Sequence, residues 1–161
     1  MAAEENKALY RRFVGEVMNQ GNLEAVEEII APNYINYSVP SVERGPEGTN
    51  LARGPEGIKE LVSSFRTAFP DMRATPEAVF ADGDVVIGRG VWEGTHHGEF
   101  QGIAPTSARV RVPYIDIWRI EDDKFVETWV QMDLLGLMQQ IGTFPPHPST
   151  GGVGKQTPSP G

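Results

Sequence analysis

The first part of the chain repeats its apolar residues with a period near 3.6, which is typical of amphipathic helices. Residues 5–19 carry two adjoining apolar rows, Leu9, Phe13 and Val17 in one and Tyr10, Val14 and Met18 in the other. We predict a second helix over 23–31, which ends before Pro32. A third helix is predicted over 54–69, where Pro55 suits the first turn because that turn needs no N–H donor.

After Asp71 the apolar residues alternate with polar ones, and a period of about two is typical of strands. The predicted strands cover residues 72–81, 85–97, 109–121 and 125–133. Short turns separate the first pair and the last pair, whereas 98–108 reads as a loop. Helices followed by antiparallel strands predict an α+β fold, with the helices on one face of a curved sheet and a concave side left open.

Two segments fall outside these patterns. The pentapeptide RGPEG occurs at 44–48 and again at 53–57, and we interpret the first copy as loop and the second as the start of the third helix. The last segment, 144–161, contains nine Pro or Gly residues, which disfavours regular structure. We therefore divide the chain into one domain, 1–143, and a Pro/Gly-rich tail, 144–161.

Composition excludes several classes of function. The 161 residues include no cysteine, which removes disulfides, thiolate catalysis and cysteine metal sites. The net charge of −8 disfavours nucleic acid as a partner, since a polyphosphate is repelled. No apolar run approaches the roughly 20 residues that a membrane helix needs. The N-terminal segment lacks the pattern of a signal peptide, so we expect a cytoplasmic protein without membrane contact.

The sequence contains none of the strong catalytic signatures. It has no phosphate-binding loop, no dinucleotide-binding fingerprint and no nucleophile elbow. Its histidines are His96, His97 and His147, and the first two are adjacent. Adjacent side chains on a strand point to opposite faces, so these two do not chelate one metal together. We predict no metal site.

The most unusual polar residue of the predicted strands is Asp116. In VPYIDIWRI it shares one strand face with Tyr114 and Trp118. One interpretation is that Asp116 pairs with an arginine or faces solvent. The other is a carboxyl group in a cavity, whose pKa rises because burial disfavours the charged form. Such a group would serve as an acid or a base.

Two further groups are candidates for a pocket. Asn36 lies with Tyr34 and Tyr37 in PNYINY, which is either a capped turn or the rim of a pocket for an oxygen-rich flat molecule. His96 follows a Gly-Thr pair at a strand end, where a histidine is either a structural hydrogen-bonding residue or a catalyst.

Several segments in the same order resemble the SnoaL-like polyketide cyclase (ester cyclase) family of the nuclear-transport-factor-two-like superfamily. They are NKALYRRFVGEVMNQGNLEAVEEIIAPNYINY, ARGPEGIKELVSSFRTAFPDM, GTHHGEFQGIAPT, YIDIWRIEDDKFVETW and DLLGLMQQIG. The resemblance covers about Asn6 to Gly142. It implies a cone-shaped α+β barrel with a deep pocket, usually a homodimer or homotetramer, and ring closure by aldol condensation without metal or organic cofactor. It also implies pocket positions for Asn36, His96 and Asp116.

The chain departs from the family pattern at its last strand. Many relatives read E-H-W-D-x-x-D where this chain has Thr128 for the histidine and Val130 for the first aspartate, which is the acid/base of the aldol cyclases. The face formed by Thr128, Val130 and Met132 should line the cavity, yet it carries no acid or base. Tyr37 stands where many relatives have histidine. Asp133 matches the second aspartate, and we expect it to cap the last helix.

These observations predict a cofactor-independent cyclase or isomerase that acts on a hydrophobic, oxygenated small molecule. Asp116 is the predicted base, and Asn36, Tyr37 and His96 are the predicted hydrogen-bond donors. The predicted substrate-binding residues are Tyr37, Tyr114, Trp118, Thr128, Val130 and Met132. Two alternatives remain open: a non-catalytic small-molecule-binding protein, favoured by the loss of the acid at 130, and a cofactor-free hydroxylase-like relative. An epoxide hydrolase is disfavoured, because Tyr114 stands where that chemistry requires arginine.

Overall fold

The computed structural model describes residues 2–37 and 52–143. Its helical elements are α1 (Ala2–Arg12), the π-helix η1 (Phe13–Asn19), the 3-10 turn η2 (Leu23–Ala25), α2 (Val26–Ile29), α3 (Gly54–Ala68) and α4 (Leu134–Gln140). Its strands are β1 (Ile30–Asn36), β2 (Ala52–Arg53), β3 (Arg73–Asp82), β4 (Val85–Thr95), β5 (Arg109–Glu121) and β6 (Lys124–Met132). The first RGPEG copy and the predicted tail lie outside the described residues.

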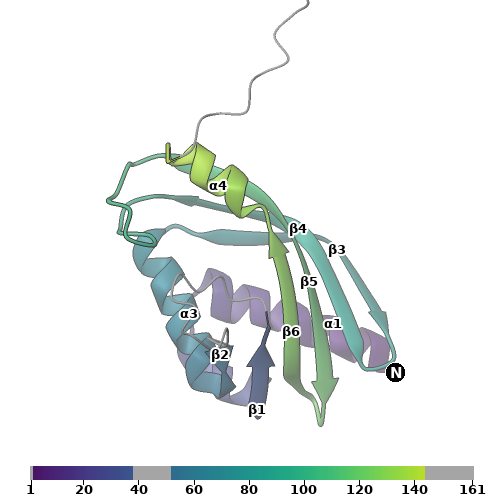
Figure 1. Cartoon of the computed structure of the whole chain (residues 1–161). Helices are drawn as coiled ribbons and strands as arrows, with labels where there is room; N and C mark the ends of the chain where they lie inside the picture. The colour runs from purple at the N-terminus through teal and green to yellow at the C-terminus, as the bar shows by residue number, and fades with distance from the viewer. Residues whose placement is uncertain (1, 38–51, 144–161) are drawn as a thin grey trace, which may run out of the picture.

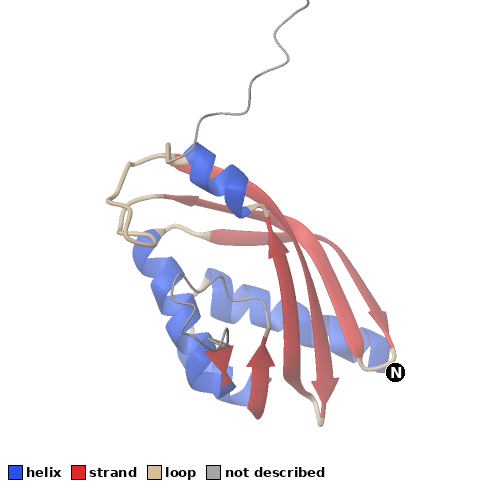
Figure 2. Ribbon diagram, viewed as in Figure 1, coloured by secondary structure: helices blue, strands red, loops and turns tan. Residues whose placement is uncertain are grey.

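The strands form one mixed sheet in the order β2-β1-β6-β5-β4-β3, and the pairs from β6 through β3 are antiparallel. The sheet curves strongly, and α1, η1 and α3 lie across its concave side (Figures 1 and 2). The predicted α+β architecture, with helices on one face of a curved and mostly antiparallel sheet, is therefore confirmed.

The predicted helix over 23–31 was wrong at its last two residues. The helix α2 ends at Ile29, and β1 follows at once and pairs in parallel with β6. Ile29 and Ile30 are both fully buried, and β-branched side chains suit a strand. Pro32 cannot donate a hydrogen bond to a helix, and the β1–β6 register shifts in this part of the strand. Asn36 is consequently the last residue of a strand.

The other predicted boundaries differ less from those of the structure. The first helix continues past Arg12 as a π-helix, and the strand predicted over 85–97 ends at Thr95. The second RGPEG copy does begin α3, with Gly54 at a φ of 61° and Pro55 in the first turn. Glycine tolerates this left-handed conformation because it has no Cβ.

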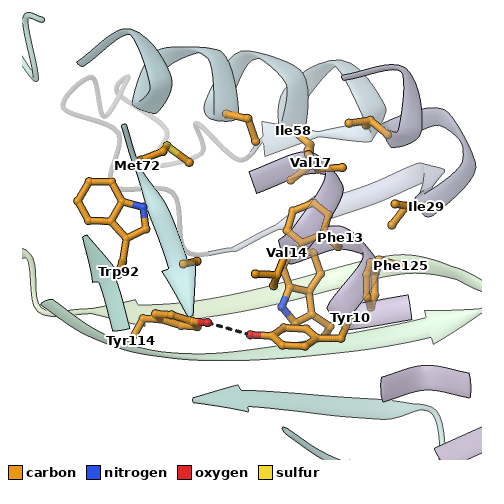
Figure 3. Packing of buried hydrophobic residues seen from close by; sticks show 14 of the residues in the cluster. Tyr10, Phe13, Val14, Val17, Ile29, Ile58, Met72, Trp92, Tyr114 and Phe125 are labelled. Carbon is orange, nitrogen blue, oxygen red and sulfur yellow. Dashed lines mark hydrogen bonds between the residues drawn. The ribbon is translucent and has the colours of Figure 1, made fainter. Parts of the chain in front are cut away.

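The hydrophobic core fills the space between the helices and the sheet (Figure 3). Aromatic rings form its centre: Trp118 of β5 lies 4.7 Å from Phe13 of η1 and 4.6 Å from Phe125 of β6, measured between ring centroids. Phe13 and Trp118 also line a cavity that lies beside this core.

Candidate active site

The cavity lies between the helices and the inner face of β4, β5 and β6, and its volume is about 340 Å³. Most of its wall is apolar, which is usual for small-molecule sites. The lining residues are Phe13, Val14, Met18, Asn36, Tyr37, Ile58, Leu61, Val62, Phe65, Ala74, Trp92, Tyr114, Asp116, Trp118, Trp129, Val130, Gln131, Met132 and Leu134. Asp116 is the only carboxyl group among them.

Asp116 is buried in this wall with 7% of its surface exposed. Its Oδ1 accepts a hydrogen bond of 2.9 Å from the Tyr10 hydroxyl, and no described arginine, lysine or histidine forms an ion pair with it. The interpretation that Asp116 faces solvent or pairs with an arginine does not hold within the described part of the chain.

Burial raises the pKa of Asp116 from 3.8 to about 6, because the charged form loses its contact with water. The Trp118 indole and the Tyr10 hydroxyl oppose part of this increase. The indole acts on the carboxyl group although its Nε1 makes no hydrogen bond of normal geometry. A pKa of about 6 suits a group that exchanges protons near neutral pH.

Two tyrosines lie near this carboxyl group, and Figure 3 shows their hydroxyl groups pointing toward each other. The hydroxyl oxygens of Tyr10 and Tyr114 are 3.4 Å apart, and Tyr114 lines the cavity whereas Tyr10 lies behind its wall. Burial raises the pKa of Tyr114 to about 12, and burial together with the Asp116 charge raises the pKa of Tyr10. Both hydroxyls therefore stay protonated at neutral pH and act as hydrogen-bond donors.

The space for these groups depends on a glycine of the neighbouring strand. Gly88 of β4 pairs with Asp116 of β5. A Cβ atom at Gly88 would lie 1.9 Å from the Tyr10 hydroxyl oxygen and 2.5 Å from Asp116 Oδ1. Any other residue at this position would displace one of the two groups.

The inward-facing side chains of β6 lie beside those of the neighbouring strand β5, which include Asp116. The register pairs Tyr114 with Met132, Asp116 with Val130 and Trp118 with Thr128. Val130 and Met132 line the cavity, but Thr128 is fully buried and its hydroxyl donates to the Ile117 carbonyl over 3.3 Å. The predicted cavity face of β6 thus carries no acid or base, and its third member is a core residue.

The predicted donors Asn36 and Tyr37 lie at different depths of the cavity. Asn36 is buried in the wall at the end of β1. Tyr37 lies at the rim with 41% of its surface exposed, where its ring stacks on Trp129 at 5.3 Å and its hydroxyl donates to Glu127 over 3.1 Å. Asn36 and Tyr37 are therefore part of the pocket wall, whereas Tyr34 of the same segment belongs to the core.

His96 lies outside the lining of the cavity. It is fully buried against Phe69, with ring centroids 5.4 Å apart. Its Nδ1 accepts a hydrogen bond of 3.3 Å from the Thr106 backbone N–H and lies 3.0 Å from the Thr106 hydroxyl. The structure does not bring His96 to Asp116, and these contacts instead connect the end of β4 to the following loop.

Comparison with known proteins identifies the family. The family model for SnoaL-like polyketide cyclases matches residues 8–141. The chain belongs to this family. TsrD from Streptomyces laurentii is 28% identical with a TM-score of 0.75, over 88% of this chain and 97% of TsrD. IdmH from Streptomyces antibioticus, a proposed polyketide cyclase, is 30% identical with a TM-score of 0.73, over 84% of this chain and 97% of IdmH.

A third solved structure of similar fold carries a different functional description. AclR from Streptomyces galilaeus, a proposed hydroxylase, is 27% identical with a TM-score of 0.74, over 91% of this chain and 87% of AclR. The comparison with curated proteins found no match. Membership of the SnoaL-like family therefore establishes the fold, whereas the reaction depends on the residues that line the cavity.

Sequence reasoning missed the helical side of this SnoaL-like pocket. Tyr10 was read only as part of an apolar stripe, and Phe13, Val14 and Met18 as core. A hydroxyl at the edge of an apolar helix stripe is a weak signal, because tyrosine is common in cores.

Among the described residues no group of three or more His, Asp or Glu side chains is arranged to hold a metal ion. No described helix is both long and apolar enough to cross a bilayer.

Proposed function

We propose that this SnoaL-like protein is a cofactor-independent cyclase or isomerase that acts on a hydrophobic, oxygenated small molecule. The observation that carries the proposal is the position of Asp116. It is buried in an apolar cavity without a cationic partner among the described residues, and its pKa is close to neutral. A carboxylate in this state can remove a proton from carbon when that carbon lies between two carbonyl groups.

In the proposed reaction the Asp116 carboxylate accepts the proton, and the electrons of the C–H bond form an enolate. The enolate carbon then forms a bond to a second carbonyl carbon of the same molecule, whose oxygen becomes an alkoxide. Protonated Asp116 returns its proton to that alkoxide, so the product is an isomer of the substrate. In this proposal the Tyr114 hydroxyl, which lines the cavity, donates a hydrogen bond to the enolate oxygen.

The base must be charged before the reaction, which sets the pH dependence. Because the pKa of Asp116 is about 6, kcat/KM should fall tenfold for each pH unit well below 6 and level off above it.

The test uses synthetic aromatic 1,3-dicarbonyl esters that carry a further ketone at ring-closing distance. Ring closure is followed by absorbance and by mass spectrometry, with wild type, Asp116→Asn and the exposed control Asp84→Asn. We expect Asp116→Asn to lose about 10²–10⁴-fold in rate and the control to keep it. A full rate in Asp116→Asn would remove this residue from the chemistry.

Mass spectrometry also separates two other candidate functions. Val130, where the aldol cyclases have their acid, favours a binding protein, and the similarity to AclR favours a hydroxylase-like reaction. A cyclase yields a new compound of unchanged mass, or one lighter by a water molecule. A hydroxylase adds one oxygen atom, and a binding protein returns every bound compound unchanged.

A further inference from the structure

We propose that Tyr10 is a positioning residue: its hydroxyl holds Oδ1 of Asp116 and leaves Oδ2 as the oxygen that faces the cavity. The inference rests on the proposed role of Asp116 as the base. It assigns a function to a residue of the first helix that does not line the cavity.

The geometry supports a fixed carboxyl group. Tyr10 is fully buried on α1 and reaches β5 across the core, where its hydroxyl lies 2.9 Å from Asp116 Oδ1. The Tyr114 hydroxyl is 3.4 Å from the same oxygen of Tyr10 (Figure 3). Its ring is held by the surrounding core, so the hydroxyl has little freedom to move. Rotation of the carboxyl group about χ2 would break this bond.

Gly88 makes this bond possible. The Tyr10 hydroxyl occupies the volume that a Cβ at Gly88 would take, since the two atoms would be 1.9 Å apart. Three elements therefore build the arrangement: a tyrosine from α1, a glycine from β4 and the aspartate from β5. Removal of the Tyr10 hydroxyl group alone should therefore free the Asp116 carboxyl group without disturbing the strands β4 and β5.

The groups that face Asp116 from the surrounding elements are uncharged. They are Tyr10 from α1, the Gly88 backbone from β4, Tyr114 and Trp118 from β5, and Tyr34 from β1, whose pKa the Asp116 charge helps to raise. Donation by Tyr10 favours the charged form of Asp116 and lowers its pKa, against the effect of burial. Loss of this donor should therefore raise the pKa of Asp116.

The experiment is a carbon-13 NMR titration of the aspartate carboxyl groups in the full chain, with Asp116 assigned from the signal that Asp116→Asn removes. We expect Tyr10→Phe to raise the pKa of Asp116 by about one pH unit. The matched control is Tyr34→Phe. Tyr34 is equally buried and packs on Trp118, but its hydroxyl does not bond to Asp116, so the pKa should stay unchanged.

A second variant keeps the proposal testable even if Tyr10→Phe does not fold. Site-specific 3-fluorotyrosine at position 10 keeps the shape of the ring and makes its hydroxyl a stronger donor, so the pKa of Asp116 should fall. The inference is overturned if neither change at position 10 moves the pKa, or if Tyr34→Phe moves it as much as Tyr10→Phe. The titration needs no substrate, so its failure is separate from a failure to observe ring closure.

Discussion

The buried Asp116 carboxyl group makes stability depend on pH in the opposite sense to most surface acids. Its pKa is about 6 in the folded chain and 3.8 without burial, so between these values the folded state binds the proton more tightly. The stabilising effect of protonation is fully present below pH 3.8 and is lost as pH rises through 6. The difference of about two pH units corresponds to about 3 kcal/mol.

Asp116→Asn should therefore stabilise the protein at neutral pH, since asparagine has no charge to desolvate. We expect the free energy of unfolding of the variant to exceed that of wild type by up to about 3 kcal/mol at pH 7. The gain should shrink toward zero at pH 4, where wild-type Asp116 is largely protonated in the folded state. Urea denaturation at the two pH values measures this, and an equal difference at both would contradict it.

At the scale of single residues, the strand pattern carried more information than the helix pattern. Alternation along 109–121 placed Asp116, Tyr114 and Trp118 on one face, and the structure confirms that all three line the cavity. Tyr10 could not be assigned, because its bond to Asp116 joins positions 106 residues apart. His96 does not line the cavity, since the chain leaves β4 at Thr95 and the buried ring packs against Phe69.

At the scale of elements, one side chain joins the end of η1 to the edge strand β3. The Asn19 amide group accepts a hydrogen bond of 2.7 Å from the Ala74 N–H and donates one of 2.9 Å to the Ala74 carbonyl. The amide thus pairs with the open side of β3 as a further strand would. Ala74 lines the cavity, so this contact also fixes one part of the cavity wall.

Replacement of Asn19 by alanine should leave both Ala74 groups without these partners. We expect a loss of about 1–3 kcal/mol in the free energy of unfolding, because the site is partly buried. Amide hydrogen exchange at Ala74 should accelerate more than exchange in β5. The control is Asn22→Ala: that residue is exposed and its side chain caps nothing, so a similar loss there would contradict the role of Asn19.

The elements that could be predicted are those whose apolar residues follow a clear helical or strand period. The third helix has a clear 3.6-residue period and a proline at its start, and apolar residues alternate with polar ones along the strands β3 to β6. Asp133 caps α4 as expected, since its Oδ1 accepts a hydrogen bond of 2.9 Å from Gly136 N–H. The strand β1 was missed because its first residues, Ile30 and Ala31, continue a helical apolar pattern, and its pairing with β6 is a distant contact.

At the scale of the whole molecule, the outer face of the sheet carries an apolar row that crosses four strands. The register aligns Phe80 with Ile87 and Ile87 with Ile117. Trp129, the partner of Ile117 on β6, ends the row at the cavity rim, where its ring stacks on Tyr37. The ion pair of Arg89 with Glu77 flanks one side of the row, and that of Arg119 with Glu127 flanks the other. Each flank therefore carries one positive and one negative side chain.

We therefore propose that a second copy of the chain covers this row, as the expected homodimer would require. Ile117→Lys should shift the protein to monomer at micromolar concentration, because it places a charge in the centre of the apolar row. Light scattering coupled to size exclusion measures the mass. Leu135→Lys, at an exposed apolar position on α4 outside the row, should not change it. A wild-type monomer would refute the proposed assembly.

The parallel pairing of β1 with β6 has a consequence for biosynthesis. Asn36 pairs with Thr128, so the cavity wall is complete only after the whole segment between these two residues has been made. A nascent chain on the ribosome cannot enclose the cavity until almost all of the described residues have emerged. Such distant pairing also slows folding, because the long intervening chain must be ordered before the contact forms. Until then, the apolar lining remains exposed to other molecules in the cell.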